Sequence, residues 1–509
     1  MAEVRKNELV TVKVENQSGD GSGVARLNGL VIFVKGGLAG ETCRVRLETV
    51  HKTAAWGHVE EVLEASPARI EPDCPYAADC GGCQLRHMTY AQELELKRQH
   101  VQDALTRIGG QNITVDVIHG AEHPERYRNK AQFPVQPGKS GAQIGFYRAG
   151  SHQVVDTEHC LLQKPEADAA AHAVRLWMRT CQIPAYDERT HRGLVRHVYV
   201  RTNRAGESLI CLVVNGERVP SEKSLISRLR AACPGAVGIL LCVNTEKTNV
   251  ILGSRYRLLW GQDFLLDELC GLQFRLSVPS FYQVNREQAE VLYRRAADFA
   301  GLTGKETAVD LYCGTGTISL VLAGQAGHVI GAEIVPEAVA DARENARRNG
   351  IGNAEFLCAD AGEAAAELAR RGLRPDVISV DPPRKGLSRP VIDAIGRMDP
   401  KRVVYVSCDP ATLARDVRLL EERGYRPDRA EAVDMFPRTV HVETVCLLVS
   451  RKQGRTSTAV RENGIPFELK PETPNDTTEA AIQEGKRLLA DPSSPRCSGM
   501  EELKAALEA

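Results

Sequence analysis

Apolar and polar positions follow three successive patterns along this chain. Between Leu9 and Leu63, short apolar runs alternate with glycine-rich turns, which predicts a small OB-like β-barrel. Apolar positions from Tyr90 to Ile108 recur at helical spacing, and the stretch from Arg192 to Val214 alternates with period two, so a mixed α/β region is expected next. From Leu272 onward, apolar strands alternate with helical segments, which predicts an α/β fold with a doubly wound sheet of about seven strands.

These changes of pattern divide the 509-residue chain into four parts, as its length also suggests. We expect a barrel in residues 1–65, a mixed α/β domain in 66–270, a doubly wound domain in 271–451 and an appended tail in 452–509. The helix predicted from Tyr90 to Ile108 is a candidate to pack on the doubly wound domain.

Acidic residues close successive strands of the doubly wound part. They are Asp310, Glu333, Asp360 and Asp381, and the next apolar strand ends at Cys408. Because ligands of open α/β sheets bind at the carboxyl ends of the strands, we expect these side chains to meet in one site. Taken alone, Cys408 is more typical of a small buried apolar residue, and the neighbouring motifs reverse that preference.

The turn after the first of these strands reads Asp310-Leu-Tyr-Cys-Gly-Thr-Gly-Thr317. Its glycines let a ligand approach the backbone, but Ser319 replaces the third glycine of the dinucleotide fingerprint. Glu333, at the next strand end, is placed to accept hydrogen bonds from both hydroxyls of a ribose. Without a pyrophosphate-binding loop, the pattern favours S-adenosylmethionine, whose sulfonium is cationic. Cys313 within the turn is expected to be a small packing residue.

Asp381-Pro-Pro-Arg384 follows the fourth strand, where class I methyltransferases hold the acceptor base. Methylases of exocyclic nitrogens carry an aromatic residue at the position of Arg384, so this pattern together with Cys408 favours methylation of carbon. Carbon 5 of a pyrimidine reacts only after a thiolate adds to carbon 6, and a base must later remove the carbon 5 proton. Cys408 and Glu443 are the candidates, although Glu443 also suits a surface strand. A cytosine methylase typically carries its cysteine where this chain has Arg384.

Fifteen cysteines are many for a reducing compartment, which points to metal ligation or catalysis rather than disulfides. Cys74, Cys80 and Cys83 cluster around two glycines, and Cys160 lies far downstream. Four cysteines can hold zinc or a [4Fe–4S] cluster. The spacing lacks the two matched Cys-x-x-Cys pairs of most structural zinc sites, which favours the cluster. His159 is expected beside the ligands rather than among them.

Aromatic and basic residues interleave in Tyr127 to Phe133 and in Gly141 to Arg148, a pattern that suits stacking on single-stranded RNA or, alternatively, a solvated hairpin. The net charge of −1 gives no general attraction to polyanions, so RNA binding would rest on local patches. No apolar run approaches the length of a membrane span, and the polar start is not a signal peptide. A cytoplasmic protein without membrane association is therefore expected.

Five motifs together resemble the RNA uracil-5 methyltransferase family over roughly residues 5–451. They are Ser280-Phe-Tyr-Gln-Val-Asn, Asp310-Leu-Tyr-Cys-Gly-Thr-Gly, Asp381-Pro-Pro-Arg-Lys-Gly, Ser407-Cys-Asp-Pro and His441-Val-Glu-Thr-Val. The first residues resemble a TRAM domain, through the Gly21-Ser-Gly-Val-Ala-Arg turn and the Val34 to Glu41 loop. A generic small barrel without a ligand would look much the same.

This resemblance implies a class I, Rossmann-like methyltransferase sheet, with Cys408 as the nucleophile and Glu443 as the base. The implied contacts to S-adenosylmethionine are Gln283, Tyr312, Thr317, Glu333, Asp360 and Asp381. The implied ligands of a [4Fe–4S] cluster are Cys74, Cys80, Cys83 and Cys160. The barrel and the cysteines resemble the branch that modifies 23S ribosomal RNA, so uridine there is the expected target. The alternatives are another RNA such as transfer RNA, or a non-catalytic RNA-binding or iron-sensing scaffold.

The tail continues past the end of the family pattern. Gly464 to Lys470 and the helical segments Thr478 to Leu489 and Gly499 to Leu507 resemble RelB/DinJ-type antitoxins. This resemblance implies a small RNase-type toxin as a partner, while a remnant and an unrelated disordered appendage stay open.

Overall fold

The computed structural model describes residues 4–139 and 141–453, which fall within one compact unit, Met1–Gly454. The antitoxin-like segments expected after Gly464 lie outside the described residues, so the toxin partner stays a prediction. None of the described helices is both long and apolar enough to cross a membrane.

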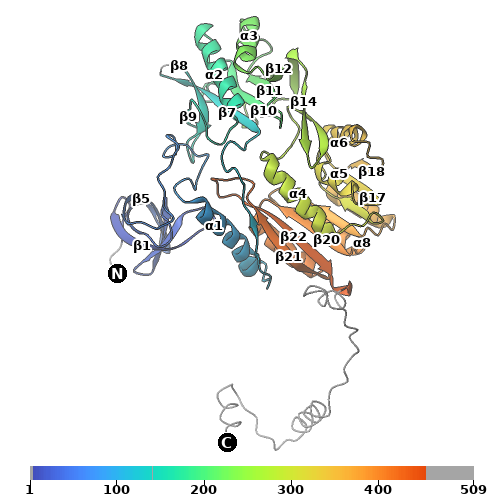
Figure 1. The fold of residues 1–509 in the computed structure, drawn as a ribbon. Helices are drawn as coiled ribbons and strands as arrows, with labels where there is room; N and C mark the ends of the chain where they lie inside the picture. Colours follow the sequence, from blue (N-terminus) through green and yellow to red (C-terminus); the bar gives the residue numbers. More distant parts are fainter. Residues whose placement is uncertain (1–3, 140, 454–509) are drawn as a thin grey trace, which may run out of the picture. The chain divides into compact units, whose positions relative to one another are not determined.

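The expected barrel is present and closed, with the strand order β1-β2-β3-β5-β4. Its strands are β1 (Leu9–Gln17), β2 (Gly23–Leu27), β3 (Leu30–Lys35), β4 (Thr42–Val50) and β5 (Ala54–Glu64). Alternate residues of β1, namely Val10, Val12 and Val14, point into the barrel core, as period-two spacing requires. Figure 1 shows these strands in blue next to the N-terminus.

A seven-stranded sheet follows, with the order β13-β12-β11-β10-β7-β8-β9. Its strands are β7 (Lys130–Gly138), β8 (Gly141–Tyr147), β9 (Val154–Asp156), β10 (Val195–Thr202), β11 (Ser208–Val214), β12 (Ala236–Val243) and β13 (Arg255–Gly261). Helices α2 (Pro165–Thr180) and α3 (Glu222–Ala232) cover one face, and the hairpin of β14 (Phe264–Leu269) and β15 (Leu272–Ser277) contacts the other.

The alternation predicted around β10 does not mark an exposed face, because every residue of β10 is buried. Its arginines are satisfied by carbonyl groups of neighbouring segments. Arg201 donates to the carbonyl of Ser280 at 2.5 Å, and Arg196 donates to the carbonyls of Asn244 and Glu246. Such pairing is what permits a buried guanidinium.

The doubly wound sheet has eight strands rather than about seven, in the order β18-β17-β16-β19-β20-β22-β21-β6. They are β6 (Ile118–His119), β16 (Thr307–Asp310), β17 (His328–Glu333), β18 (Ala354–Cys358), β19 (Val377–Val380), β20 (Arg402–Ser407), β21 (Tyr425–Val433) and β22 (Glu443–Ser450). The extra strand β6 comes from the segment before the seven-stranded sheet and pairs in parallel with β21. Its two residues are too short for a periodic signal, which is why the sequence did not predict it.

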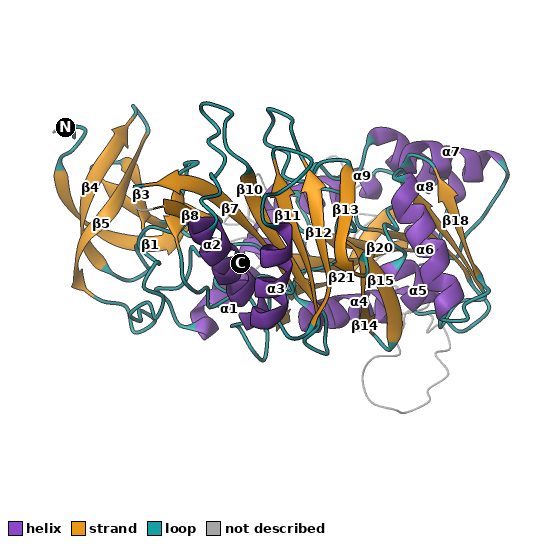
Figure 2. Cartoon of the chain, turned by 90° about the horizontal axis from the view of Figure 1, so that it is seen from above, coloured by secondary structure: helices purple, strands orange, loops and turns teal. Residues whose placement is uncertain are grey.

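Helices cover both faces of this sheet (Figure 2). One face packs against α4 (Arg286–Ala300), α5 (Thr317–Ala323) and α6 (Pro336–Arg348). The other face packs against α7 (Ala361–Arg370), α8 (Arg389–Met398) and α9 (Pro410–Glu421). A short 3₁₀ turn, Arg451–Gln453, ends the described chain. This two-sided burial explains why the central strands are continuously apolar.

The helix expected from Tyr90 to Ile108 forms and packs on the eight-stranded sheet. It consists of α1 (Tyr90–Asp103) continued by the π-helical turn η1 (Ala104–Ile108). Figure 1 shows α1 beside β21 and β22, and it contacts β21, β6 and α9. The buried Lys97 of α1 donates hydrogen bonds to Glu93 at 2.7 Å and to Asp434 at 2.6 Å.

Candidate active site

All eight residues predicted for chemistry or cofactor binding in the doubly wound part line one pocket of about 660 Å³. We call it the strand-end pocket, because most of these residues lie at or just beyond the carboxyl ends of sheet strands. The predicted residues are Gln283, Tyr312, Thr317, Glu333, Asp360, Asp381, Cys408 and Glu443. The pocket thus lies where the strand order reverses between β16 and β19, the usual ligand position in such sheets.

The glycine turn after β16 is built to approach a ligand closely. Gly314 and Gly316 have φ angles of +53° and +86°, a backbone region that side chains disfavour. The amide of Gly314 donates to the Glu333 carboxylate at 3.1 Å, and the amide of Val335 donates to it at 2.9 Å. These bonds fix the Glu333 carboxylate at the end of β17. Cys313 is buried in the core, as expected for a packing residue.

Two carboxyl groups make the pocket favourable for a cation, the half-buried Asp381 that lines it and the buried Asp310 nearby. Burial, together with the Asp310 carboxylate, raises the pKa of Asp381 to about 7. Burial also raises the pKa of Asp310 to about 6, although the Ser319 hydroxyl donates to it at 2.6 Å. Among the described residues, none donates a hydrogen bond to the side chain of Asp381, so a bound cation would stabilise its charged form.

Cys408 and Glu443 lie at neighbouring ends of two paired strands. Strands β20 and β22 are antiparallel, and Ser407 pairs with Thr444. The next position outward on each strand is therefore Cys408 on one and Glu443 on the other, and both line the pocket. Side chains at such positions lie about 5 Å apart at Cβ. This geometry places a thiol and a carboxyl group side by side in one pocket.

Glu443 is not a surface carboxylate, since only 3% of it is exposed. Burial and the nearby Asp381 raise the pKa of Glu443 to about 8, while the Arg384 guanidinium opposes the shift. A carboxylate with this proton affinity is suited to act as a base near neutral pH.

The Cys408 thiol is protonated in the resting pocket. Burial and the carboxylates of Glu443 and Asp381 raise the pKa of Cys408 to about 11. A nucleophilic role for this thiol would require its proton to leave during attack rather than before it. Asp409 then begins α9, because its side chain accepts the amide of Thr412 at 2.8 Å.

Other pocket residues were not predicted for this site, and four of them have large apolar or aromatic side chains. Phe281 and Ile334 are 62% and 61% exposed, and Tyr293 and Phe436 line the wall. Phe281 lies within the motif Ser280-Phe-Tyr-Gln, so the sequence pointed to this segment, but only Gln283 in it was predicted to bind the cofactor. Phe436 lies in a loop without a recognisable pattern, so only the fold brings it to the pocket.

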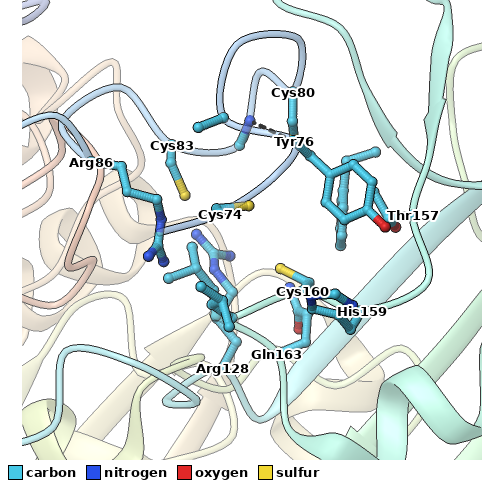
Figure 3. Close-up of a pocket in the computed structure, with 15 residues that line it drawn as sticks. Cys74, Tyr76, Cys80, Cys83, Arg86, Arg128, Thr157, His159, Cys160 and Gln163 are labelled. Carbon is cyan, nitrogen blue, oxygen red and sulfur yellow. Dashed lines mark hydrogen bonds between the residues drawn. The ribbon is translucent and has the colours of Figure 1, made fainter. Parts of the chain in front are cut away.

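The four predicted metal ligands line a second cavity, of about 170 Å³, which we call the cysteine cavity. Figure 3 shows the sulfur atoms of Cys74, Cys83 and Cys160 pointing toward a common space, with Cys80 on the loop beside them. Across the described residues, no three His, Cys, Asp or Glu side chains come together closely enough to hold a single metal ion. His159 lines the cavity next to Tyr76, at 5.8 Å between ring centroids.

The stacking role expected for Tyr127 and Phe133 is wrong, because these side chains are only 3% and 2% exposed. Tyr127 donates its hydroxyl to the carbonyl of Pro437 at 3.0 Å and belongs to the packing. A stacked aromatic pair, half-buried Phe33 and exposed Trp56, lies on the barrel instead. Phe33 and Trp56 stack at 5.3 Å with an interplanar angle of 17°, and Trp56 is 41% exposed. Exposed stacked rings suit contact with unpaired bases.

Comparison with known families gives two matches. The family described as tRNA (uracil-5-)-methyltransferase matches residues 89–452, and the TRAM domain matches residues 3–59. The first match includes every residue of the strand-end pocket named above.

Several relatives share nearly the whole described chain. A protein of Halalkalibacterium halodurans named as an uncharacterized RNA methyltransferase is 46% identical over 449 residues, covering 88% of this chain and 98% of its own. One of Clostridium tetani with the same description is 42% identical, covering 87% and 97%. The crystal structure of Pyrococcus abyssi tRNA (uracil-54, C5)-methyltransferase with S-adenosyl-L-homocysteine superposes with a TM-score of 0.70 at 27% identity, covering 86% and 100%.

Proposed function

Because this chain belongs to the tRNA (uracil-5-)-methyltransferase family, we propose that it methylates carbon 5 of a uridine in 23S ribosomal RNA through a covalent bond to Cys408. Its class, an S-adenosylmethionine-dependent RNA methyltransferase acting on uracil, follows from the family and its relatives. The observation that carries the mechanism is the position of Cys408 beside Glu443 in one pocket with Asp381. A scaffold without activity would not need this complete set.

The strand-end pocket fits S-adenosylmethionine by its chemistry. The half-buried Asp381, which accepts no hydrogen bond from the part of the chain that the structure describes, favours a cation, and the fixed Glu333 carboxylate offers acceptors for ribose hydroxyls. Gln283, Tyr312, Thr317 and Asp360 complete the proposed binding residues. When bound, S-adenosylmethionine supplies the methyl group.

We assign the chemical steps to two residues. The Cys408 sulfur bonds to carbon 6 of uracil while its proton passes to a neighbouring carboxylate, and the electron pair of the carbon 5–carbon 6 double bond moves so that carbon 5 becomes nucleophilic. After carbon 5 gains the methyl group, Glu443 removes its proton. The carbon 6–sulfur bond then breaks, which restores the double bond and releases the Cys408 thiolate, and the thiolate takes back its proton from the carboxylic acid that had received it. The uridine must leave its base stack to reach Cys408, at a cost of a few kcal/mol.

Ribosomal RNA is proposed as the target because a TRAM domain and four clustered cysteines occur together in this chain. Transfer RNA is the second candidate, favoured by the family description and by the Pyrococcus abyssi enzyme. We expect 5-methyluridine to disappear from 23S ribosomal RNA, and not from transfer RNA, when the gene is deleted. Mass spectrometry of both purified RNAs measures this, and loss from transfer RNA alone would reverse the assignment.

The cysteine cavity is proposed to hold a [4Fe–4S] cluster. Zinc binds sulfur at about 2.3 Å, so four zinc ligands must converge tightly on one point. Among the described residues, no three His, Cys, Asp or Glu side chains lie close enough together to hold a single metal ion, yet four cysteines surround a cavity of about 170 Å³. A group larger than a single ion therefore fits better. We also propose that residues 66–270 form the domain that binds the [4Fe–4S] cluster.

Protein purified without oxygen is expected to be brown and to contain about four irons with labile sulfide per chain. Cys83→Ser should lower the iron content and the melting temperature, because it removes one ligand from the cavity. The binding of S-adenosylhomocysteine, measured by calorimetry, should stay detectable, since its residues belong to the other sheet. Stoichiometric zinc without iron in the native protein would contradict the proposal.

A further inference from the structure

A loop between β21 and β22, residues 434–442, forms one wall of the strand-end pocket. Phe436 and His441 from this pocket-wall loop line the pocket, and Glu443 follows it directly. We propose that Arg438 is a positioning residue that ties the pocket-wall loop to the cysteine-bearing segment, so that a filled cysteine cavity sets the position of the catalytic base. The inference rests on the proposed function, because it concerns the base of that reaction.

The backbone of the cysteine-bearing segment holds Arg438 directly. The amides of Gln84 and Leu85 donate to the carbonyl of Arg438 at 3.0 and 3.1 Å, and these two residues follow Cys83 immediately. Arg438 has a φ angle of +70°, a strained conformation for a residue with a side chain. Such strain persists only where surrounding contacts determine it. Fixing Cys83 in the cavity therefore fixes the two amides that hold this peptide.

A chain of ion pairs runs in parallel with the backbone contacts. Arg86, which lines the cysteine cavity and is 4% exposed, donates to Glu125 at 2.7 Å. The other oxygen of Glu125 accepts a hydrogen bond from Arg438 at 3.1 Å. One carboxylate thus joins an arginine of the cavity to an arginine of the pocket-wall loop.

The same loop is held from α1. The amide of Arg438 donates to Glu93 at 2.7 Å, and Lys97 joins Glu93 to Asp434 at the beginning of the loop. Below these polar contacts, Val440 packs on a small core formed by Leu38, Leu85 and Met88. Buried charges of this kind tolerate few alternative arrangements, which makes the loop position specific.

Three variants separate the side-chain bridge from general damage. Glu125→Gln keeps the shape of the bridge but removes its charge. Arg438→Gly keeps the backbone carbonyl and accepts the positive φ, but lacks the guanidinium. Arg438→Lys restores a charge within reach of Glu125. The matched control is Asp79→Asn, which breaks the exposed pair of Asp79 with Arg148 on the same cysteine-bearing segment, away from the loop.

Backbone hydrogen exchange of the intact protein, followed by mass spectrometry, measures how firmly the pocket-wall loop is held. Glu125→Gln and Arg438→Gly should speed exchange in residues 434–442 and lower kcat between about twofold and thirtyfold. The affinity for S-adenosylhomocysteine should stay within about twofold, because none of the proposed cofactor-binding residues belongs to the pocket-wall loop. Arg438→Lys should recover most of kcat, and Asp79→Asn should change neither quantity.

Cys83→Ser tests the link to the cavity. It should also speed exchange in residues 434–442, and the effect of adding Glu125→Gln should then differ from the sum of the two single effects. Unchanged exchange in Glu125→Gln and Arg438→Gly, or strictly additive effects, would overturn the proposal. If the native enzyme proves to methylate no uridine, the proposed function fails, while hydrogen exchange still decides whether the cavity and the loop are coupled.

Discussion

Cys408→Ala is expected to lose methyl transfer almost completely, by at least about 10⁴-fold, because without the sulfur no bond to carbon 6 can form. The variant should still bind RNA and S-adenosylhomocysteine, since the thiol makes no hydrogen bond among the described residues and its removal leaves the pocket walls intact. Transfer of a labelled methyl group to RNA measures the loss.

Two further observations complete this experiment. Cys181→Ala, at the half-buried end of α2, is the matched cysteine control and should keep full activity. RNA that contains 5-fluorouridine should become covalently bound to the native enzyme, because fluorine cannot leave as the proton does, and should not bind covalently to Cys408→Ala. Substantial methyl transfer by Cys408→Ala would mean that the nucleophile is another residue.

Glu443→Gln is expected to show the opposite behaviour, since addition and methyl transfer do not consume this carboxylate. Elimination stalls when carbon 5 keeps its proton, so turnover should fall by about 10²- to 10⁴-fold while a protein–RNA adduct accumulates. Denaturing electrophoresis should reveal the adduct with the labelled methyl group in it. The adduct should be absent from the double variant Cys408→Ala, Glu443→Gln, and normal turnover of Glu443→Gln would assign the base elsewhere.

The pH dependence of the native enzyme follows from the same residue. Burial and Asp381 raise the pKa of Glu443 to about 8, and only the deprotonated carboxylate can accept the carbon 5 proton. Adduct breakdown in the native enzyme should therefore accelerate as the pH rises toward 8 and level off above it. Glu443→Gln should lose this rise, because glutamine does not titrate.

The sequence placed part of the strand-end pocket correctly because several of its residues follow local rules. Glu333 and Asp381 follow apolar strands, and parallel strands bring their carboxyl ends to one edge whatever the loops do. Cys408 and Glu443 required one more step, since their proximity depends on the antiparallel pairing of β20 with β22. The family resemblance supplied this step before the structure did.

Other features depend on contacts that no local pattern encodes. Tyr127 and Phe133 alternate with cations as an RNA-binding surface would, yet the fold buries them. Lysine is a residue type typical of exposed helix positions. Lys97 is buried because its ammonium group pairs with Asp434, which lies 337 residues away in the sequence. Phe436 enters the pocket on a loop whose position is set by the segment that carries Cys83. Pairings across such separations are not readable from spacing.

The packing of α1 and β6 against the eight-stranded sheet also constrains how the chain can be synthesised and folded. These elements leave the ribosome before the seven-stranded sheet, but β21 and β22, which they contact, are the last strands made. Until then, Lys97 and Glu93 of α1 lack their partner Asp434. The barrel and the seven-stranded sheet must fold while the eight-stranded sheet is still incomplete. The late joining of distant segments raises the contact order and favours slow completion through intermediates. The seven-stranded sheet is thus, in topological terms, an insertion within the catalytic fold.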